Sequence, residues 1–300
     1  MSGFDPKKYG TTQSDVVYCM LDGTPLGMDL YYPRSGGPWP AVVFVHGGGW
    51  SEGDKGGLAF NPSQFGYLVA SINYRLYPQA RFPAMIEDVK CAIRHLRAHA
   101  REYNLDPERI GLIGHSAGSH LVSLAGLADE SAGWDAGPDL DRSSRVQAVV
   151  AVSGPADLTR TFPDWVEELK RSVFGDAQLV SGSPVSYVHP EAPPFLIVHG
   201  DADPVVPVEQ AYLFQRALEN ARVPVELIIL HNGGHGLEPV GGALEPPIER
   251  VFLRVMEFLD SKLLFTGTIR PPLFLQPWLT RARMAFGLLD MKIRAGSSAP

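Results

Sequence analysis

A serine framed by glycines stands at Gly114-His115-Ser116-Ala117-Gly118, between an apolar run and a segment of small residues. This is the G-x-S-x-G form of a nucleophile elbow, in which a strand turns sharply into a helix and lifts a serine hydroxyl into a cleft. Such a turn is strained and brings the strand and helix backbones close together, which flanking glycines permit. The pentapeptide also recurs by chance, so it needs partners elsewhere in the chain.

A second motif, His46-Gly47-Gly48-Gly49-Trp50, directly follows the apolar run at 41–45. A strand that ends in three glycines exposes backbone N–H groups, which an acyl-transfer enzyme needs where a carbonyl oxygen becomes an oxyanion. We expect the N–H groups of Gly48, Gly49 and Ala117 to form this oxyanion hole. A phosphate cradle is the alternative, but the G-x-G-x-x-G spacing of that motif does not follow.

The acid and base that would activate Ser116 follow two later apolar runs. A neutral hydroxyl is a weak nucleophile, so a histidine must accept its proton and a carboxylate must orient that histidine. Asp201 and Asp203 both follow the run at 195–198, and either could be the acid. For the base we favour His235, because its glycine-flanked loop could carry it toward Ser116.

His199 and His231 are alternative bases, but each adjoins a strand. A histidine there is more easily buried, with its ring nitrogens hydrogen-bonded to the protein. We expect His46 to brace the glycine loop, and His115 and His120 to pack near the elbow. No H-E-x-x-H motif occurs, so we expect no metal, and no cofactor motif is recognised either.

The elements that must position these residues alternate between strands and helices, the pattern of a mostly parallel sheet covered on both faces. We predict an α/β fold with eight strands, of which the first two form an antiparallel pair joined at Asp22-Gly23. The predicted strands are 16–20, 26–32, 41–45, 67–73, 110–113, 146–152, 195–198 and 225–230. The predicted helices are 83–100, 117–128, 208–221 and 247–264. The Ser, Asp, His order along the chain is the order found in enzymes with a G-x-S-x-G nucleophile elbow.

Length and composition indicate one globular domain over residues 1–264. There is no apolar run of membrane-spanning length and no apolar segment typical of a signal peptide. Cys19 and Cys91 do not make a disulfide framework, so we expect buried free thiols and a cytoplasmic protein. The acidic body and the lack of a recognised module argue against nucleic-acid binding.

Together, HGGGW, then Asn73-Tyr74-Arg75-Leu76, then GHSAG, Asp203 and His235 resemble the α/β-hydrolase carboxylesterases. The resemblance extends over residues 16–264 and is nearest to hormone-sensitive-lipase-like, feruloyl/acetyl-xylan-esterase-like and kynurenine-formamidase-like branches. In that family the acid precedes a segment like 204–207, which favours Asp203. The resemblance implies a serine carboxylesterase acting on small-molecule esters through an acyl-Ser116 intermediate. The alternatives are an amide-bond hydrolase such as an arylformamidase and, more remotely, a non-catalytic binding protein.

The substrate pocket is the least determined feature of the sequence. We expect Trp50 and a small lid helix within 157–188, with Trp165 and Phe174, to shape it. A large N-terminal cap, which many hormone-sensitive-lipase-like enzymes have, is not evident, and this favours short-acyl or aromatic esters.

The last forty residues differ in charge from the rest of the chain. Residues 261–300 hold six basic residues and one acidic residue, a net +5, so the remainder carries −12 of the total of −7. We expect 265–300 to be a basic extension that packs on the body or contacts a second subunit in a homodimer. An amphipathic segment at 277–294 could instead lie on a membrane surface.

Overall fold

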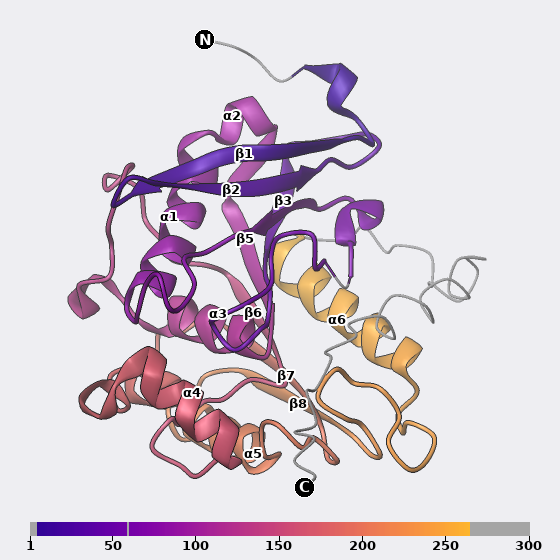
Figure 1. Ribbon diagram of the computed structural model, residues 1–300. Coiled ribbons are helices and arrows are strands. Elements are labelled where there is room, and N and C mark those ends of the chain that lie inside the picture. The colour runs from indigo at the N-terminus through magenta and orange to yellow at the C-terminus, as the bar shows by residue number, and fades with distance from the viewer. Residues whose placement is uncertain (1–4, 59, 265–300) are drawn as a thin grey trace, which may run out of the picture.

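One sheet of eight strands runs through the computed structural model, which describes residues 5–58 and 60–264 (Figure 1). The order across the sheet is β1-β2-β4-β3-β5-β6-β7-β8. The strands are β1 (Thr12–Leu21), β2 (Thr24–Tyr31), β3 (Trp39–Val45), β4 (Leu68–Ile72), β5 (Leu105–His115), β6 (Ala148–Val152), β7 (Phe195–Gly200) and β8 (Val225–Leu230). Strands β3 to β8 are parallel, whereas β2 pairs antiparallel with both β1 and β4. The predicted eight-stranded, mostly parallel sheet is confirmed.

The antiparallel start of the sheet follows from one tight turn. Asp22 and Gly23 both have positive φ angles, 49° and 75°, as the two-residue turn favoured in hairpins requires. The later strands are continuous apolar runs because both faces of the sheet are covered. Every residue of β3, β4 and β6 is buried.

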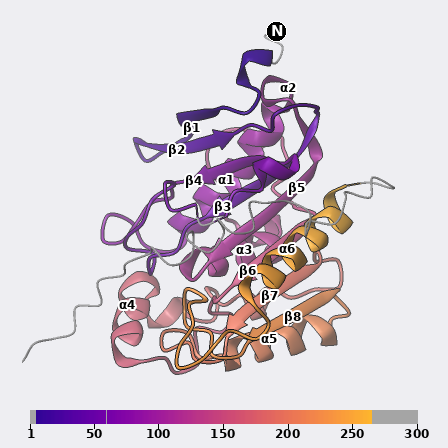
Figure 2. The ribbon, with the colours of Figure 1, turned by 90° about the vertical axis from the view of Figure 1, so that its right-hand side faces the viewer.

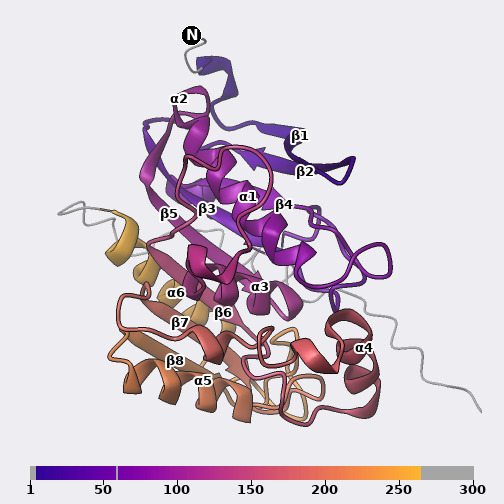
Figure 3. The ribbon, with the colours of Figure 1, turned by 90° about the vertical axis from the view of Figure 1, so that its left-hand side faces the viewer.

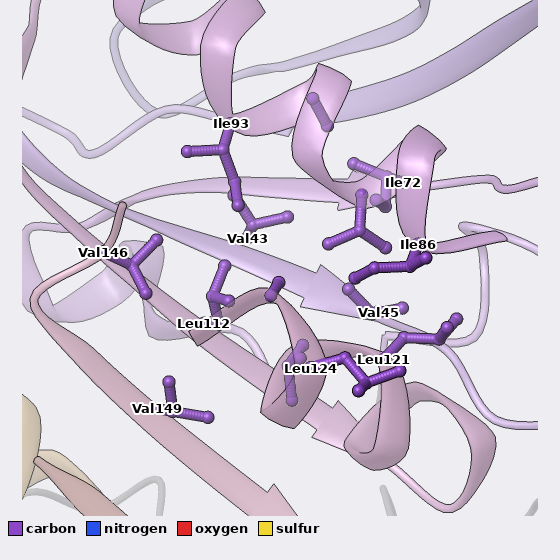
Figure 4. Packing of buried hydrophobic residues seen from close by; sticks show 14 of the residues in the cluster. Val43, Val45, Ile72, Ile86, Ile93, Leu112, Leu121, Leu124, Val146 and Val149 are labelled. Carbon is purple, nitrogen blue, oxygen red and sulfur yellow. The ribbon is translucent and has the colours of Figure 1, made fainter. Parts of the chain in front are cut away.

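Helices cover the two faces unequally. The α1 (Ala84–Ala98), α3 (Ala117–Leu127) and α5 (Glu209–Asn220) helices pack on one face, and their apolar side chains join those of the strands in the larger core (Figures 3 and 4). The α6 helix (Ile248–Leu263) packs on the other face and closes a second apolar core (Figure 2). No helix in the described ranges is long and apolar enough to cross a bilayer.

The boundaries of several predicted elements differ from the structure. The predicted helix at 83–100 ends at Ala98, and a single further turn, α2 (Ala100–Tyr103), leads into β5. That strand begins at Leu105, earlier than the predicted 110, because Leu105 pairs with Trp39 of the neighbouring strand. The expected lid helix is present as α4 (Asp164–Phe174). The predicted extension at 265–300 lies outside the described residues.

The expectation of free thiols is wrong, because Cys19 and Cys91 form a disulfide that joins β1 to α1. Both cysteines are buried, and 72 positions separate them along the chain. Which strand the first long helix packs against depends on the assembled sheet, and the sequence pattern does not contain that information. Disulfides persist mainly in oxidising compartments. The two cysteines therefore no longer support the expected reducing cytoplasm.

The disulfide closes a long loop, so removing it should lower the free energy of unfolding of the oxidised protein. We expect Cys91→Ser to cost about 2–5 kcal/mol, chiefly because the unfolded chain gains freedom. Urea unfolding of the wild type and the variant measures this difference. In excess dithiothreitol the two proteins should converge, and an equal difference with and without the reductant would contradict the assignment.

Candidate active site

The Ser116 backbone is held in a strained conformation at the turn from β5 into α3. Its φ and ψ angles are 54° and −120°, and its N–H donates to Val152 O at 2.9 Å. The flanking glycines have no room for a side chain: a Cβ at Gly114 would lie 2.3 Å from Gly118 O, and one at Gly118 would lie 2.0 Å from Val45 O. This is the geometry that the G-x-S-x-G pattern predicts.

A continuous chain of hydrogen bonds connects Ser116 to a buried carboxylate. The Ser116 hydroxyl lies 2.8 Å from His235 Nε2, and His235 Nδ1 lies 2.8 Å from Asp203 Oδ2. The three residues come from loops after β5, β8 and β7, at the edge where the carboxyl ends of the parallel strands meet. Ligands bind at this edge in open α/β sheets. The arrangement can remove a proton from a serine hydroxyl as that hydroxyl attacks a carbonyl carbon.

Asp203 is fully buried and is held in place by several donors. Its Oδ1 accepts hydrogen bonds from the N–H groups of Val205 and Val206, at 2.8 and 2.9 Å. Its Oδ2 also lies 3.3 Å from His199 Nε2. Burial alone would raise the pKa of this carboxyl, but bonds from His199, His235 and Val206 together hold the pKa well below its usual range. The carboxylate therefore stays ionised beside His235.

His199 is a second partner of the acid that sequence reasoning missed. Its Nε2 lies 2.9 Å from Val206 O, so it carries the proton, and its imidazole is fully buried. The prediction that His199 is buried is confirmed. The available signal for its role was its spacing, four residues before Asp203 at the end of β7.

The alternative acid and base pair with each other instead. His231 Nδ1 lies 2.8 Å from Asp201 Oδ2, and Asn232 N–H donates to Asp201 Oδ1 at 2.7 Å. The His231 side chain is exposed, contrary to the expectation that it would be buried. Asp201 thus bonds to the loop after β8, some 30 residues away along the chain. This pair ties the Asp203 loop to the His235 loop.

The triple-glycine loop passes directly beside the serine. A Cβ at Gly47 would lie 3.2 Å from Ser116 Cβ, and Gly48 and Gly49 have positive φ angles of 112° and 57°. Among the described residues, the N–H groups of Gly48, Gly49 and Ala117 donate no backbone hydrogen bond outside regular helices and strands. Ala117 is also the first residue of α3, where the helix dipole favours negative charge. These donors are free to face an oxyanion.

Two further histidines hold these loops together. The His46 ring lies on the Tyr74 ring with centroids 4.3 Å apart, and its Nδ1 is 2.7 Å from Gly47 O. The Tyr74 hydroxyl donates to His46 O. His115 Nε2 lies 2.9 Å from His235 O, so it braces the loop that carries the base. His46 contacts the glycine loop as expected, whereas the contact of His115 with the loop of His235 goes beyond the expected packing near the elbow.

The three residues expected to shape the pocket do not gather at one surface. Trp50 and Phe174 are buried against each other with ring centroids 5.0 Å apart, whereas the Trp165 side chain is exposed. The lid helix α4 instead brings Leu169 to the glycine loop: a Cβ at Gly49 would lie 2.6 Å from Leu169 Cδ2. Leu169 falls within the predicted lid segment at 157–188, but the sequence analysis did not place it beside the glycine loop.

His120 is held neutral by its two neighbours, one at each ring nitrogen. Its Nε2 donates to Gly182 O at 2.6 Å, and its Nδ1 accepts from the Trp50 indole N–H at 3.3 Å. A second proton would break the bond to Trp50. Burial lowers the pKa of His120 to about 4.

The stability of the fold should therefore decrease as the pH falls from about 6.5 toward 4. In that range the unfolded chain binds a proton at residue 120 that the folded protein does not, which contributes about 1.4 kcal/mol per pH unit to the slope. Urea unfolding at pH 7 and pH 5 measures the free energy of unfolding at each pH. The loss of this free energy between pH 7 and pH 5 should be smaller for His120→Gln than for the wild type. An equal loss in both proteins would show that His120 is not held neutral.

Comparisons with known proteins agree with this geometry. The BD-FAE family model matches residues 28–218. Esterase LipQ of Mycobacterium tuberculosis is 34% identical over 213 residues, covering 66% of this chain and 50% of LipQ. Esterase LipC of the same organism is 35% identical over 230 residues, covering 70% of this chain and 56% of LipC. The chain thus spans about half the length of the curated relatives it matches.

Among solved structures, the chain is similar to a thermophilic esterase of Thermogutta terrifontis, Est2, with butyrate bound. The identity is 27% and the TM-score is 0.71, over 87% of this chain and 98% of Est2. The sequence and the fold therefore point to the same group of proteins.

Proposed function

This chain belongs to the BD-FAE family of α/β-hydrolase carboxylesterases, and from this premise we propose that it hydrolyses short-acyl or aromatic carboxylic esters through an acyl-Ser116 intermediate. The observation that carries the proposal is the continuous hydrogen-bonded chain from Ser116 through His235 to the buried Asp203. A serine, a histidine base and an orienting carboxylate in such a chain are what acyl transfer to a serine uses, which supports the proposal.

In the first half of the reaction, Ser116 Oγ attacks the ester carbonyl carbon while His235 Nε2 accepts the hydroxyl proton. The carbonyl oxygen becomes an oxyanion that accepts hydrogen bonds from the N–H groups of Gly48, Gly49 and Ala117. As the tetrahedral intermediate collapses, His235 returns the proton to the leaving alcohol, and the acyl group stays on Ser116.

In the second half, water attacks the acyl carbon while His235 accepts a proton from it. The second tetrahedral intermediate then collapses: the bond to Ser116 Oγ breaks, His235 returns the proton to Ser116 Oγ, and the acid is released. Asp203 holds His235 in the tautomer that presents a free Nε2 lone pair and stabilises the imidazolium that forms. Because donors keep Asp203 ionised, it is not expected to take a proton during the cycle. His199 acts through Asp203 as a positioning residue.

The preference for small acyl groups is supported by the lid and by the structural neighbours. Leu169 of α4 approaches Gly49, and Trp50, the next residue, packs its buried ring against Phe174 of the same helix. This packing of α4 against the glycine loop supports short acyl groups rather than long ones. Related Est2 structures hold butyrate and propionate. The same triad could also hydrolyse an amide, so an amide substrate belongs in the test.

Hydrolysis of p-nitrophenyl esters from acetate to palmitate tests the proposal. We expect kcat/KM to be highest for the short acyl chains and turnover to fall by a factor of about 10⁴ or more in Ser116→Ala. Phenyl acetate and an N-formyl aromatic amine, assayed side by side, separate esterase from formamidase. Preferred hydrolysis of palmitate would overturn the proposed pocket, and activity retained by Ser116→Ala would overturn the mechanism.

Replacing each of the two neighbouring aspartates tests which one orients the base. Asp203→Asn should reduce kcat by a factor of about 10⁴, because the amide favours the wrong tautomer of His235. The matched variant Asp201→Asn removes the carboxylate that contacts His231 and should change kcat by less than about tenfold. A larger loss in Asp201→Asn than in Asp203→Asn would reverse the assignment.

A further inference from the structure

Two histidines and an aspartate meet far from the serine, at the carboxyl end of α1. His95 and His99 stand four residues apart at the end of this helix, and their rings stack with centroids 4.1 Å apart. Asp139 approaches them from the segment that connects α3 to β6. One ligand atom from each of the three residues lies within 4.8 Å of the other two. Residues one helical turn apart present their side chains on the same face.

Each imidazole already has one ring nitrogen occupied by a protein group. His99 Nδ1 donates to His95 O at 2.9 Å, which leaves Nε2 with its lone pair. His95 Nε2 lies 2.9 Å from the Tyr103 hydroxyl, which leaves Nδ1. Histidine ligands of metals characteristically use the second nitrogen in this way, because the bond fixes the tautomer and the ring orientation.

The three candidate ligands differ in their exposure to solvent. His95 itself is buried, while His99 and Asp139 are partly exposed and leave a path from solvent.

The segment that carries Asp139 is anchored by ion pairs to α1 and by close packing on the disulfide. Asp135 forms ion pairs with the buried side chains of Lys90 and Arg94. A Cβ at Gly137 would lie 2.9 Å from Cys19 Sγ, so the segment also rests on the disulfide. The segment runs over the outer side of α1 (Figure 3). These anchors hold Asp139 beside the two histidines without any ion.

We propose that His95, His99 and Asp139 form a site for one divalent transition-metal ion of the Zn²⁺ class. Two imidazoles and one carboxylate suit Zn²⁺, Co²⁺ or Ni²⁺, whereas Ca²⁺ and Mg²⁺ prefer oxygen ligands alone. Metal–ligand distances are near 2.0–2.2 Å, so the three atoms, which lie within 4.8 Å of one another, would close in around a bound ion.

The proposed ion would stabilise the fold rather than take part in ester hydrolysis. The site adjoins Tyr103, just before β5 begins at Leu105, whereas Ser116 follows the other end of that strand. A bound ion would join α1 to the 128–147 segment. The expectation that the chain binds no metal rested on the missing H-E-x-x-H motif, yet His95 and His99 have the spacing of its two histidines without its glutamate.

The test is Co²⁺ and Zn²⁺ titration of the full-length protein after chelator treatment, followed by visible absorption, calorimetry and thermal unfolding. We expect one ion per chain and a higher melting temperature at saturation. His99→Gln and Asp139→Asn should each weaken metal binding by at least about tenfold. Loss of a residue that only hydrogen-bonds to a metal ligand already lowers the affinity for the metal by about that factor. The control His231→Gln removes an exposed histidine outside the site and should bind like the wild type.

Esterase activity without metal should be unchanged in His99→Gln and Asp139→Asn, which shows that the variants fold. Absence of binding to the wild type, or binding that neither variant weakens, would overturn the proposal. A failure of the proposed esterase activity would leave these binding results unaffected, so the two proposals fail separately.

Discussion

The close packing of α3 against the ends of β3 and β5 is the constraint on which the site depends. At Gly114 and Gly118 the backbones approach so closely that a Cβ atom at either position would overlap a neighbouring carbonyl group. This contact holds Ser116 in its left-handed conformation and directs its hydroxyl out of the turn. It also brings the start of α3 beside the triple-glycine loop, because β3 and β5 are neighbouring parallel strands. Ser116 and the N–H groups proposed to bind the oxyanion are therefore positioned by one packing interaction.

The acid and base depend on a second arrangement, at the ends of β7 and β8. These strands are neighbours, and the Asp201–His231 pair joins the loops that follow them. Asp203 can then be buried as a carboxylate because two backbone N–H groups and two histidines surround it. Burial without these donors would favour the protonated acid, which could not orient a neutral imidazole. The cost of burying the charge is offset by bonds that also fix its direction.

The other edge of the sheet is organised differently, around helix α1. A disulfide, buried ion pairs and the histidine cluster all lie along this helix and bind it to β1 and to the 128–147 segment. None of these interactions includes a residue of the loops that hold Ser116, Asp203 and His235. The molecule thus separates cross-links that hold its scaffold from the loops that carry the chemistry, as is common where loops on a rigid scaffold hold the functional residues.

Much of the fold and of the candidate site could be predicted from local sequence. Apolar runs without alternation identify strands covered on both faces, and the Asp22-Gly23 turn identifies the opening hairpin, because these signals depend only on neighbouring residues. The glycine motifs before Trp50 and around Ser116 likewise report a local steric demand, and the structure places both where that demand exists.

Only the tertiary structure decided the pairings between distant segments. The sequence left Asp201 and Asp203 both adjacent to the same strand, and only the assembled sheet determines which of them His235 contacts. It did not show that Cys19 meets Cys91, that Asp139 meets His95, or that Leu169 rather than Trp165 lies on the glycine loop. Local pattern encodes which residues are buried and how the backbone turns. The contacts between distant segments depend on strand order and helix placement, which arise only when all the apolar faces are buried together.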